Sequence, residues 1–289
     1  MKSLVILGVF FSITSAFAAS ESMESRFHLL SMKCESEAGD SLETSPQSPP
    51  LDVDDPGTPG CNKWEINLLT NGDFTRAENK FELPLLDINY GIGDNLQLKY
   101  EVPMEKTQAA DSSHSNVGNS KVGFKYMFFE DEESKLQLAF YPQMDFATPG
   151  PKDTNKDPES SGNIVTLPFL LSAKIGETKK GDVMLTTNVG YNVSSRADTK
   201  NSVFLLTGIG MPLSKKISMM AEFSTEQAME KNSDDIREQL VKTNLGLVAT
   251  INKHFFLYGS LGKSLFSSDG EEHTYALTGV RFVTDGLEK

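Results

Sequence analysis

The chain has 289 residues, a formal net charge of −13 at pH 7 and a hydrophobic content of 38%. The acidic balance argues against a nucleic-acid-binding protein, which needs a basic surface to neutralise phosphates. Outside the N-terminus, no stretch reaches the roughly 18 to 20 apolar residues of a membrane-spanning helix, so a polytopic helical membrane protein is excluded. A membrane β-barrel stays compatible with this composition, because only alternate residues of its strands face lipid.

The first 18 residues show the three parts of a secretory signal peptide in order. Lys2 supplies the positive start, Leu4–Ile13 the apolar core, and Ala16–Ala18 the small-x-small pattern that signal peptidase cleaves. We therefore expect an exported protein whose mature chain begins after Ala18.

Residues 19–62 are predicted to form a flexible segment that emerges in the periplasm. The stretch is rich in Pro, Ser and Asp, and it buries too little apolar surface to order itself. Cys34 and Cys61 are the two cysteines of the chain and flank most of this stretch. In an oxidising compartment we expect them to pair as a disulfide, and no Cys-x-x-Cys spacing suggests a redox role.

From residue 63 to 289, apolar and polar residues alternate with period two, which is typical of β-strands. In Asn95–Met104, five apolar residues on one face oppose Gln97, Lys99 and Glu101 on the other. The pattern predicts about twelve strands and no helix. They span residues 64–70, 81–90, 95–104, 121–129, 136–146, 164–175, 183–192, 202–211, 217–225, 241–251, 255–265 and 273–283.

The connections between these strands alternate between short and long. The short ones are residues 91–93, 130–134, 177–181, 214–216 and 252–254, and the long ones are 71–80, 105–120, 147–162, 194–201, 226–238 and 267–272. This parity predicts an all-β, up-and-down antiparallel transmembrane barrel, with tight periplasmic turns and long outer loops. An even strand count would place both termini in the periplasm of a Gram-negative bacterium. A Greek-key sandwich has no reason to sort its loops in this way.

Period two does not by itself say which face is wet, because a soluble lipocalin-like barrel has the same alternation turned inside out. Charged residues within the strands favour lipid on the outside, since burying them in a dry core is costly. The polar faces then line a lumen. The predicted lumen-lining residues are Gln97, Lys99, Glu101, Gln137, Gln143, Asp145, Asn188, Glu222, Lys242 and Arg281.

Three stretches of the sequence carry a family resemblance. They are WEINL at residues 64–68, ELPLLDINYGIGDNLQLKYEVPM at 82–104 and VGFKYMFFEDEE at 122–133. Together they resemble bacterial outer-membrane barrels grouped with the "MetA-pathway of phenol degradation" proteins. The resemblance implies an outer-membrane barrel with a transporter or channel role, and it supplies no catalytic residue.

No arrangement of residues predicts catalysis. His114 and His254 fall on opposite rims, and His273 lacks the Ser and Asn partners of a lipid hydrolase, so an outer-membrane lipid hydrolase is the least favoured function. The carboxylate runs at 130–133 and 52–55 are interpreted as solvated charges rather than calcium sites. We expect neither a metal nor a cofactor.

The function predicted from the sequence is a passive channel for small solutes, hydrophobic or aromatic ones if the family name describes the cargo. Opposite charges inside the barrel would alternatively satisfy one another and plug it. In that case the barrel is non-conducting, with a structural, ligand-binding or adhesive role. The expected partners are outer-membrane lipid, the barrel-insertion machinery and a solute of unknown identity.

Overall fold

The computed structural model describes Phe27, Cys34 and residues 52–148, 162–197, 199–232 and 235–285. The predicted signal peptide and most of the predicted flexible segment lie outside the described residues. No helix within the described ranges has the length and apolar character needed to cross a lipid bilayer.

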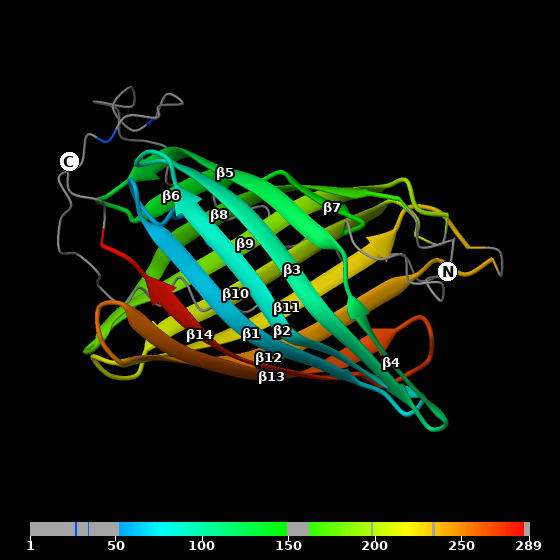
Figure 1. Cartoon of the computed structure of the whole chain (residues 1–289). Helices are drawn as coiled ribbons and strands as arrows, with labels where there is room; N and C mark the ends of the chain where they lie inside the picture. Colours follow the sequence, from blue (N-terminus) through cyan, green and yellow to red (C-terminus); the bar gives the residue numbers. More distant parts are fainter. Residues whose placement is uncertain are drawn as a thin grey trace, which may run out of the picture.

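The described residues form fourteen β-strands in one antiparallel sheet, which closes on itself where β1 pairs with β14 (Figure 1). The strands are β1 (Trp64–Phe74), β2 (Glu78–Gly91), β3 (Leu96–Ala109), β4 (Ser112–Val117), β5 (Ser120–Asp131), β6 (Leu136–Phe140), β7 (Gln143–Phe146), β8 (Ile164–Thr178), β9 (Gly181–Ser194), β10 (Ser202–Pro212), β11 (Ile217–Ala228), β12 (Gln239–Thr250), β13 (Phe255–Ser267) and β14 (Thr274–Val283).

The wall of the barrel has twelve strands, as the sequence predicts. β4 pairs only with the far end of β3 and projects beyond the wall. β6 and β7 together make one wall strand, because both pair with β5 on one side and β8 on the other. The interruption falls at Tyr141-Pro142, where proline has no N–H to donate to the ladder. The side chain of Tyr141, beside this proline, points into the interior and is 1% exposed.

Apolar side chains cover the outside of the barrel. Leu98, Phe169 and Leu261 are 46%, 56% and 69% exposed. Polar residues next to exposed apolar ones point inward and are buried, such as Gln97 beside Leu98 on β3 and Asn188 beside Val189 on β9. This distribution excludes the lipocalin-like arrangement, in which the apolar face would fill the interior. It matches a wall whose outer face contacts lipid.

Two predicted long loops are strands instead. β1 and β2 continue past the expected loop at 71–80 and leave only residues 75–77 between them, because Asn71 and Asp73 pair with β2 and Thr75 bonds across to Glu78. The expected loop at 105–120 is largely the hairpin of β3 and β4. Polar residues, four of them Ser, make up most of residues 105–120, and they are compatible with a strand ladder as well as with a loop. The five short turns lie at one end of the barrel, as predicted.

Candidate functional site

Ion pairs cross-link β2, β3 and β5 on the inner side of the wall. Lys99 Nζ of β3 lies 3.5 Å from Asp87 Oδ1 of β2 and 2.7 Å from Glu101 Oε2. Glu101 also pairs with Lys121 Nζ of β5 at 3.2 Å. Each charge faces an opposite one, which offsets the cost of removing it from water. The pairs therefore join three neighbouring wall strands inside the barrel.

A second polar group continues this network around the wall. Arg281 of β14 donates through Nε to Asn67 Oδ1 of β1 at 3.2 Å and lies 3.6 Å from Glu65 Oε1. Gln97 Nε2 donates to Asn89 Oδ1 at 2.6 Å. Paired polar side chains thus line the interior from β14 through β1, β2 and β3 to β5.

Residues 52–60, which we call the inner segment, cross the interior of the barrel. Asp52 pairs with Lys242 of β12, Oδ2 to Nζ, at 2.6 Å. The carbonyl oxygens of Asp55 and Gly57 accept hydrogen bonds from Lys125 Nζ of β5 at 2.7 and 2.9 Å. β5 and β12 lie six strands apart in the closed wall, so the inner segment bridges opposite sides of the lumen.

Wall side chains hold the inner segment mainly through its main chain. The two carboxylate oxygens of Glu222 accept the N–H groups of Asp52 and Val53, each at 3.2 Å. Asn188 accepts the N–H of Asp54 at 2.8 Å and donates to its carbonyl at 2.6 Å. These contacts leave Val53 almost fully buried.

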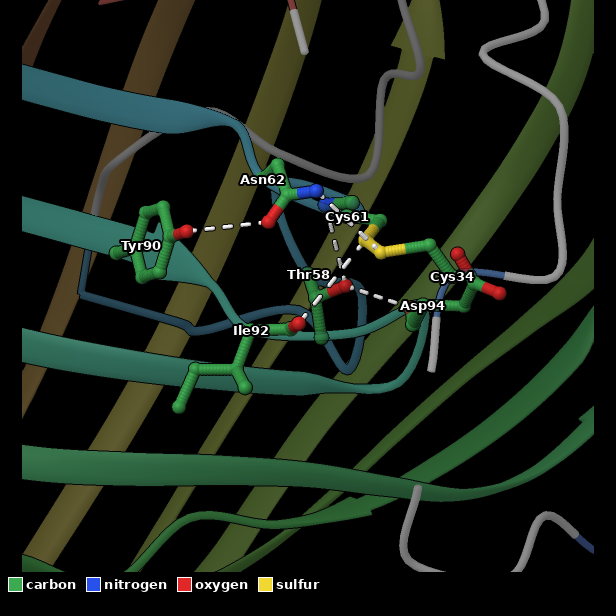
Figure 2. The surroundings of a disulfide bond; sticks show 8 residues. Cys34, Thr58, Cys61, Asn62, Tyr90, Ile92 and Asp94 are labelled. Atoms are coloured by element: carbon green, nitrogen blue, oxygen red, sulfur yellow. Dashed lines mark hydrogen bonds between the residues drawn. A yellow bond between two sulfur atoms is a disulfide. The ribbon is translucent and has the colours of Figure 1, made fainter. Parts of the chain in front are cut away.

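The inner segment is anchored at the turn between β2 and β3 (Figure 2). Thr58 Oγ1 donates to the carbonyl of Asp94 at 2.9 Å. The carbonyl of Gly60 would lie 1.8 Å from a Cβ atom added at Gly91, so this crossing of two main chains requires glycine there. Directly after the segment, Cys61 forms a disulfide with Cys34, with Cα atoms 5.6 Å apart.

These contacts differ from the prediction of a flexible periplasmic tail over residues 19–62. Within that range, residues 52–57 lie inside the barrel and residues 58–62 contact the turn between β2 and β3. The physical reason is that the acidic, polar stretch finds amide, ammonium and carboxylate partners on the wall that replace water. The carboxylate run at 52–55, interpreted as solvated, is therefore part of this internal contact.

Three hollows of about 300, 450 and 540 Å³ open into the loop-side half of the interior. Asp52 and Lys242 line both of the smaller two. The ion pair between Asp52, the first residue of the inner segment, and Lys242 therefore lies between these two hollows.

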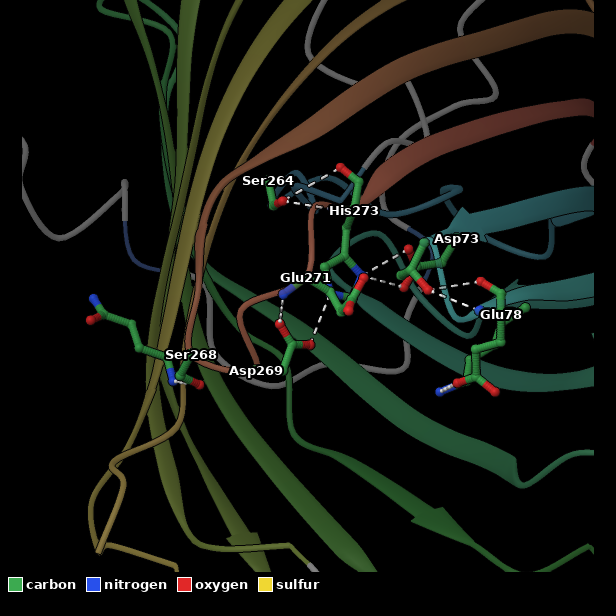
Figure 3. Close-up of polar contacts among 10 residues, drawn as sticks. Asp73, Glu78, Ser264, Ser268, Asp269, Glu271 and His273 are labelled. Atoms are coloured by element: carbon green, nitrogen blue, oxygen red, sulfur yellow. Dashed lines mark hydrogen bonds and ion pairs between the residues drawn. The ribbon is translucent and has the colours of Figure 1, made fainter. Parts of the chain in front are cut away.

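The loop between β13 and β14 is fastened to β1 by His273 (Figure 3). Its ring lies 3.0 Å from Asp73 through Nδ1 and 3.0 Å from Asp269 through Nε2. Partial burial lowers the pKa of His273, but the hydrogen bonds and charges of Asp269 and Asp73 outweigh burial and raise it above its ordinary value. The ring also stacks on Tyr275 at 5.9 Å. His273 also lines the hollow of about 540 Å³.

The ten predicted lining residues fall into separate groups. Gln97, Lys99, Glu101 and Arg281 belong to the polar network that runs from β14 to β5, and Asn188, Glu222 and Lys242 hold the inner segment. Asp145 pairs with Arg196 near the loops, Gln137 donates to Glu130 at 2.7 Å, and Gln143 borders the smallest hollow. Their role in lining a conducting lumen stays a prediction.

Several interior residues are missing from the lining residues predicted from the sequence. Lys125, Asp87 and Asn244 all contact the inner segment or the ion-pair network. Lys125 lies four residues from Lys121 on the same face of β5. The period-two alternation of this strand therefore already indicated that Lys125 faces the interior. Among the described residues, no group of three or more His, Cys, Asp or Glu side chains is arranged to hold a metal ion.

The fold resembles known bacterial outer-membrane proteins. The outer membrane channel COG4313 from Pseudomonas putida F1 is 13% identical, with a TM-score of 0.66 over 81% of this chain and all of that one. The NanC porin is 11% identical, with a TM-score of 0.53 over 75% and 98% of the two chains. The KdgM porin in complex with oligogalacturonate is 11% identical, with a TM-score of 0.50 and the same coverage.

At these identities the resemblance concerns the fold alone. No curated protein sequence matches the chain. The family model described as "Membrane bound beta barrel domain (DUF5777)" matches residues 79–258, which is more than half of the sequence. With its apolar outer face and closed sheet, the chain therefore belongs to this family of membrane-bound β-barrels.

Proposed function

We propose that the protein is a passive channel of the bacterial outer membrane for small solutes, with the inner segment as a removable plug. The observation that carries the proposal is the mode of attachment: the inner segment is held by side-chain contacts and forms no strand of the wall. The wall stays closed by its own ladder without it. The hollows on the loop side supply an entrance, and the similar folds of channels and porins agree with this role.

In this proposal the protein is exported by its signal peptide and has both termini in the periplasm. The short turns then face the periplasm and the hollows face the outside. The solute class suggested by the "MetA-pathway of phenol degradation" resemblance stays a prediction, as does the absence of enzymatic activity.

A second candidate is a non-conducting barrel with a structural or ligand-binding role. The ion pairs of β2, β3 and β5 favour it, because they and the inner segment together occupy part of the interior through which a passage would have to continue. The difference between the candidates is whether the inner segment ever leaves.

Single-channel recording in a planar bilayer separates the two. We expect the purified full chain to give rare discrete current steps, and Lys125→Met to give more frequent ones because it removes two bonds to the segment. Lys121→Met is the matched control, because Lys121 lies on the same strand and face but pairs with Glu101 of the wall instead of the segment. If neither the full chain nor Lys125→Met gives discrete steps, the channel proposal is wrong.

A further inference from the structure

The contacts of the inner segment indicate what class of molecule the interior can bind. Glu222, Asn188 and Lys125 all bond to main-chain atoms, and side chains of the segment take no part in these bonds. N–H groups are accepted at three successive residues, 52 to 54, and carbonyl groups are bound at residues 54, 55 and 57. Main-chain N–H and C=O groups are shared by every peptide. These bonds to the wall therefore do not depend on which side chains the segment carries.

The three wall residues form a built site. Asn188 is 3% exposed, and Lys125 and Glu222 are each 5% exposed. Buried polar groups are costly unless they are hydrogen-bonded, so withdrawal of the inner segment leaves these groups in need of new partners. A small anion could satisfy the ammonium of Lys125 but not the carboxylate of Glu222, and a small cation has the converse problem. A peptide supplies both N–H donors for Glu222 and Asn188 and carbonyl acceptors for Asn188 and Lys125.

One contact adds a side-chain preference. The carboxylate of Asp52 meets Lys242 Nζ and Asn244 Nδ2, each at 2.6 Å. The hollow of about 300 Å³ beside it is lined partly by Phe204 and Leu206, which leaves room for an apolar neighbour. The site thus favours an acidic residue towards the N-terminal end of the bound peptide.

We propose that the interior binds short peptides, preferably acidic at that position, where residues 52–57 now lie, and that such peptides are solutes of the channel. The transport part of this inference rests on the proposed function, whereas binding follows from the contacts alone. In this view the inner segment occupies its own channel's substrate site and must be displaced before a solute binds.

Competition with the inner segment tests the inference. The probe is the synthetic peptide acetyl-DVDDPGT-amide, which matches residues 52–58. The reporter is the rate at which a thiol reagent modifies Val53→Cys in the full chain, because Val53 is 3% exposed while the segment is docked. A tethered segment competes at an effective concentration in the millimolar range, so millimolar peptide is needed, and we expect at least about a threefold faster reaction.

Two control solutes make the test specific. The first is the same peptide N-methylated at the residues that match Val53 and Asp54, which removes two N–H donors. The second is a neutral oligosaccharide of similar mass. We expect neither to change the rate. Equal acceleration by all three solutes, or by none, overturns the inference.

A second measurement covers the case in which the cysteine variant does not fold, and the combined outcomes separate peptide binding from transport. If Val53→Cys does not fold, a benzophenone-bearing version of the peptide is photo-crosslinked to the unaltered chain. We then expect adducts on β9 and β11, and adducts confined to the outer loops contradict the site. A barrel that conducts but ignores the peptide refutes this inference and leaves the channel proposal intact. A barrel that binds the peptide without conducting refutes transport and keeps the binding site.

Discussion

Lys125 is the residue whose loss should most clearly release the inner segment. Its ammonium donates two hydrogen bonds to main-chain carbonyls of the segment and lies 4.8 Å from the centre of the Tyr141 ring. A hydrogen bond from a charged donor contributes about 1.5 to 3 kcal/mol. Lys125→Met removes both bonds and also the cost of burying the ammonium, so we expect a net loss of about 2 to 3 kcal/mol in docking.

This loss corresponds to an increase of about 30- to 150-fold in the undocked fraction, since each 1.4 kcal/mol changes an equilibrium tenfold. The assay is the rate of thiol modification at Val53→Cys in detergent-solubilised barrels, with and without Lys125→Met. Lys121→Met should change the rate by less than about threefold, because Lys121 pairs with Glu101 on the wall. Equal rates with Lys125→Met and Lys121→Met would refute the assigned contacts.

Three further predictions concern the anchors of the interior. Gly91→Ala should also expose Val53→Cys, because the new Cβ would collide with the main chain at Gly60, whereas Gly176→Ala has space and should not. Replacing both Cys34 and Cys61 by Ser opens a loop with a sequence separation of 27 and should destabilise docking of residues 52–60, seen as faster proteolysis of that range; unchanged proteolysis would count against the anchor. The pKa of His273 is raised on folding, so its stabilising effect is fully present below its ordinary pKa of about 6.5 and is lost as pH rises through the folded pKa. Hydrogen exchange of residues 268–273, corrected for intrinsic rates, should therefore accelerate at alkaline pH in the unaltered chain. His273→Gln should abolish this additional pH dependence. An identical pH profile in both proteins would contradict the role of His273.

The wall could be predicted from the sequence because each strand carries its own signal. In Leu96–Ala109, alternation alone separates Leu98, which faces outward, from Lys99, which faces inward. The pattern is local, so no knowledge of distant residues is needed. It fails at 71–80, where polar residues pair as strands even though their composition is typical of a loop.

The inner segment could not be predicted in the same way. Its residues form no periodic pattern, and their partners lie far along the chain, for example Asn188, which is 134 residues from Asp54. Composition alone makes DVDDPG a solvated run, because nothing local shows that Lys125 or Glu222 will face it. Asn188 and Glu222 could be assigned to the interior from their strands, whereas the chain that occupies them could not.

The central claim is that solutes and the inner segment share one path through the barrel. The most direct test joins Asp54→Cys to Asn188→Cys, whose parent residues bond to each other at 2.8 Å, with a short bis-maleimide. Single-channel currents are recorded from the same barrels before and after crosslinking. The account predicts that the current steps seen before crosslinking disappear once the segment is fixed in place. Currents that continue unchanged through crosslinked barrels would contradict it.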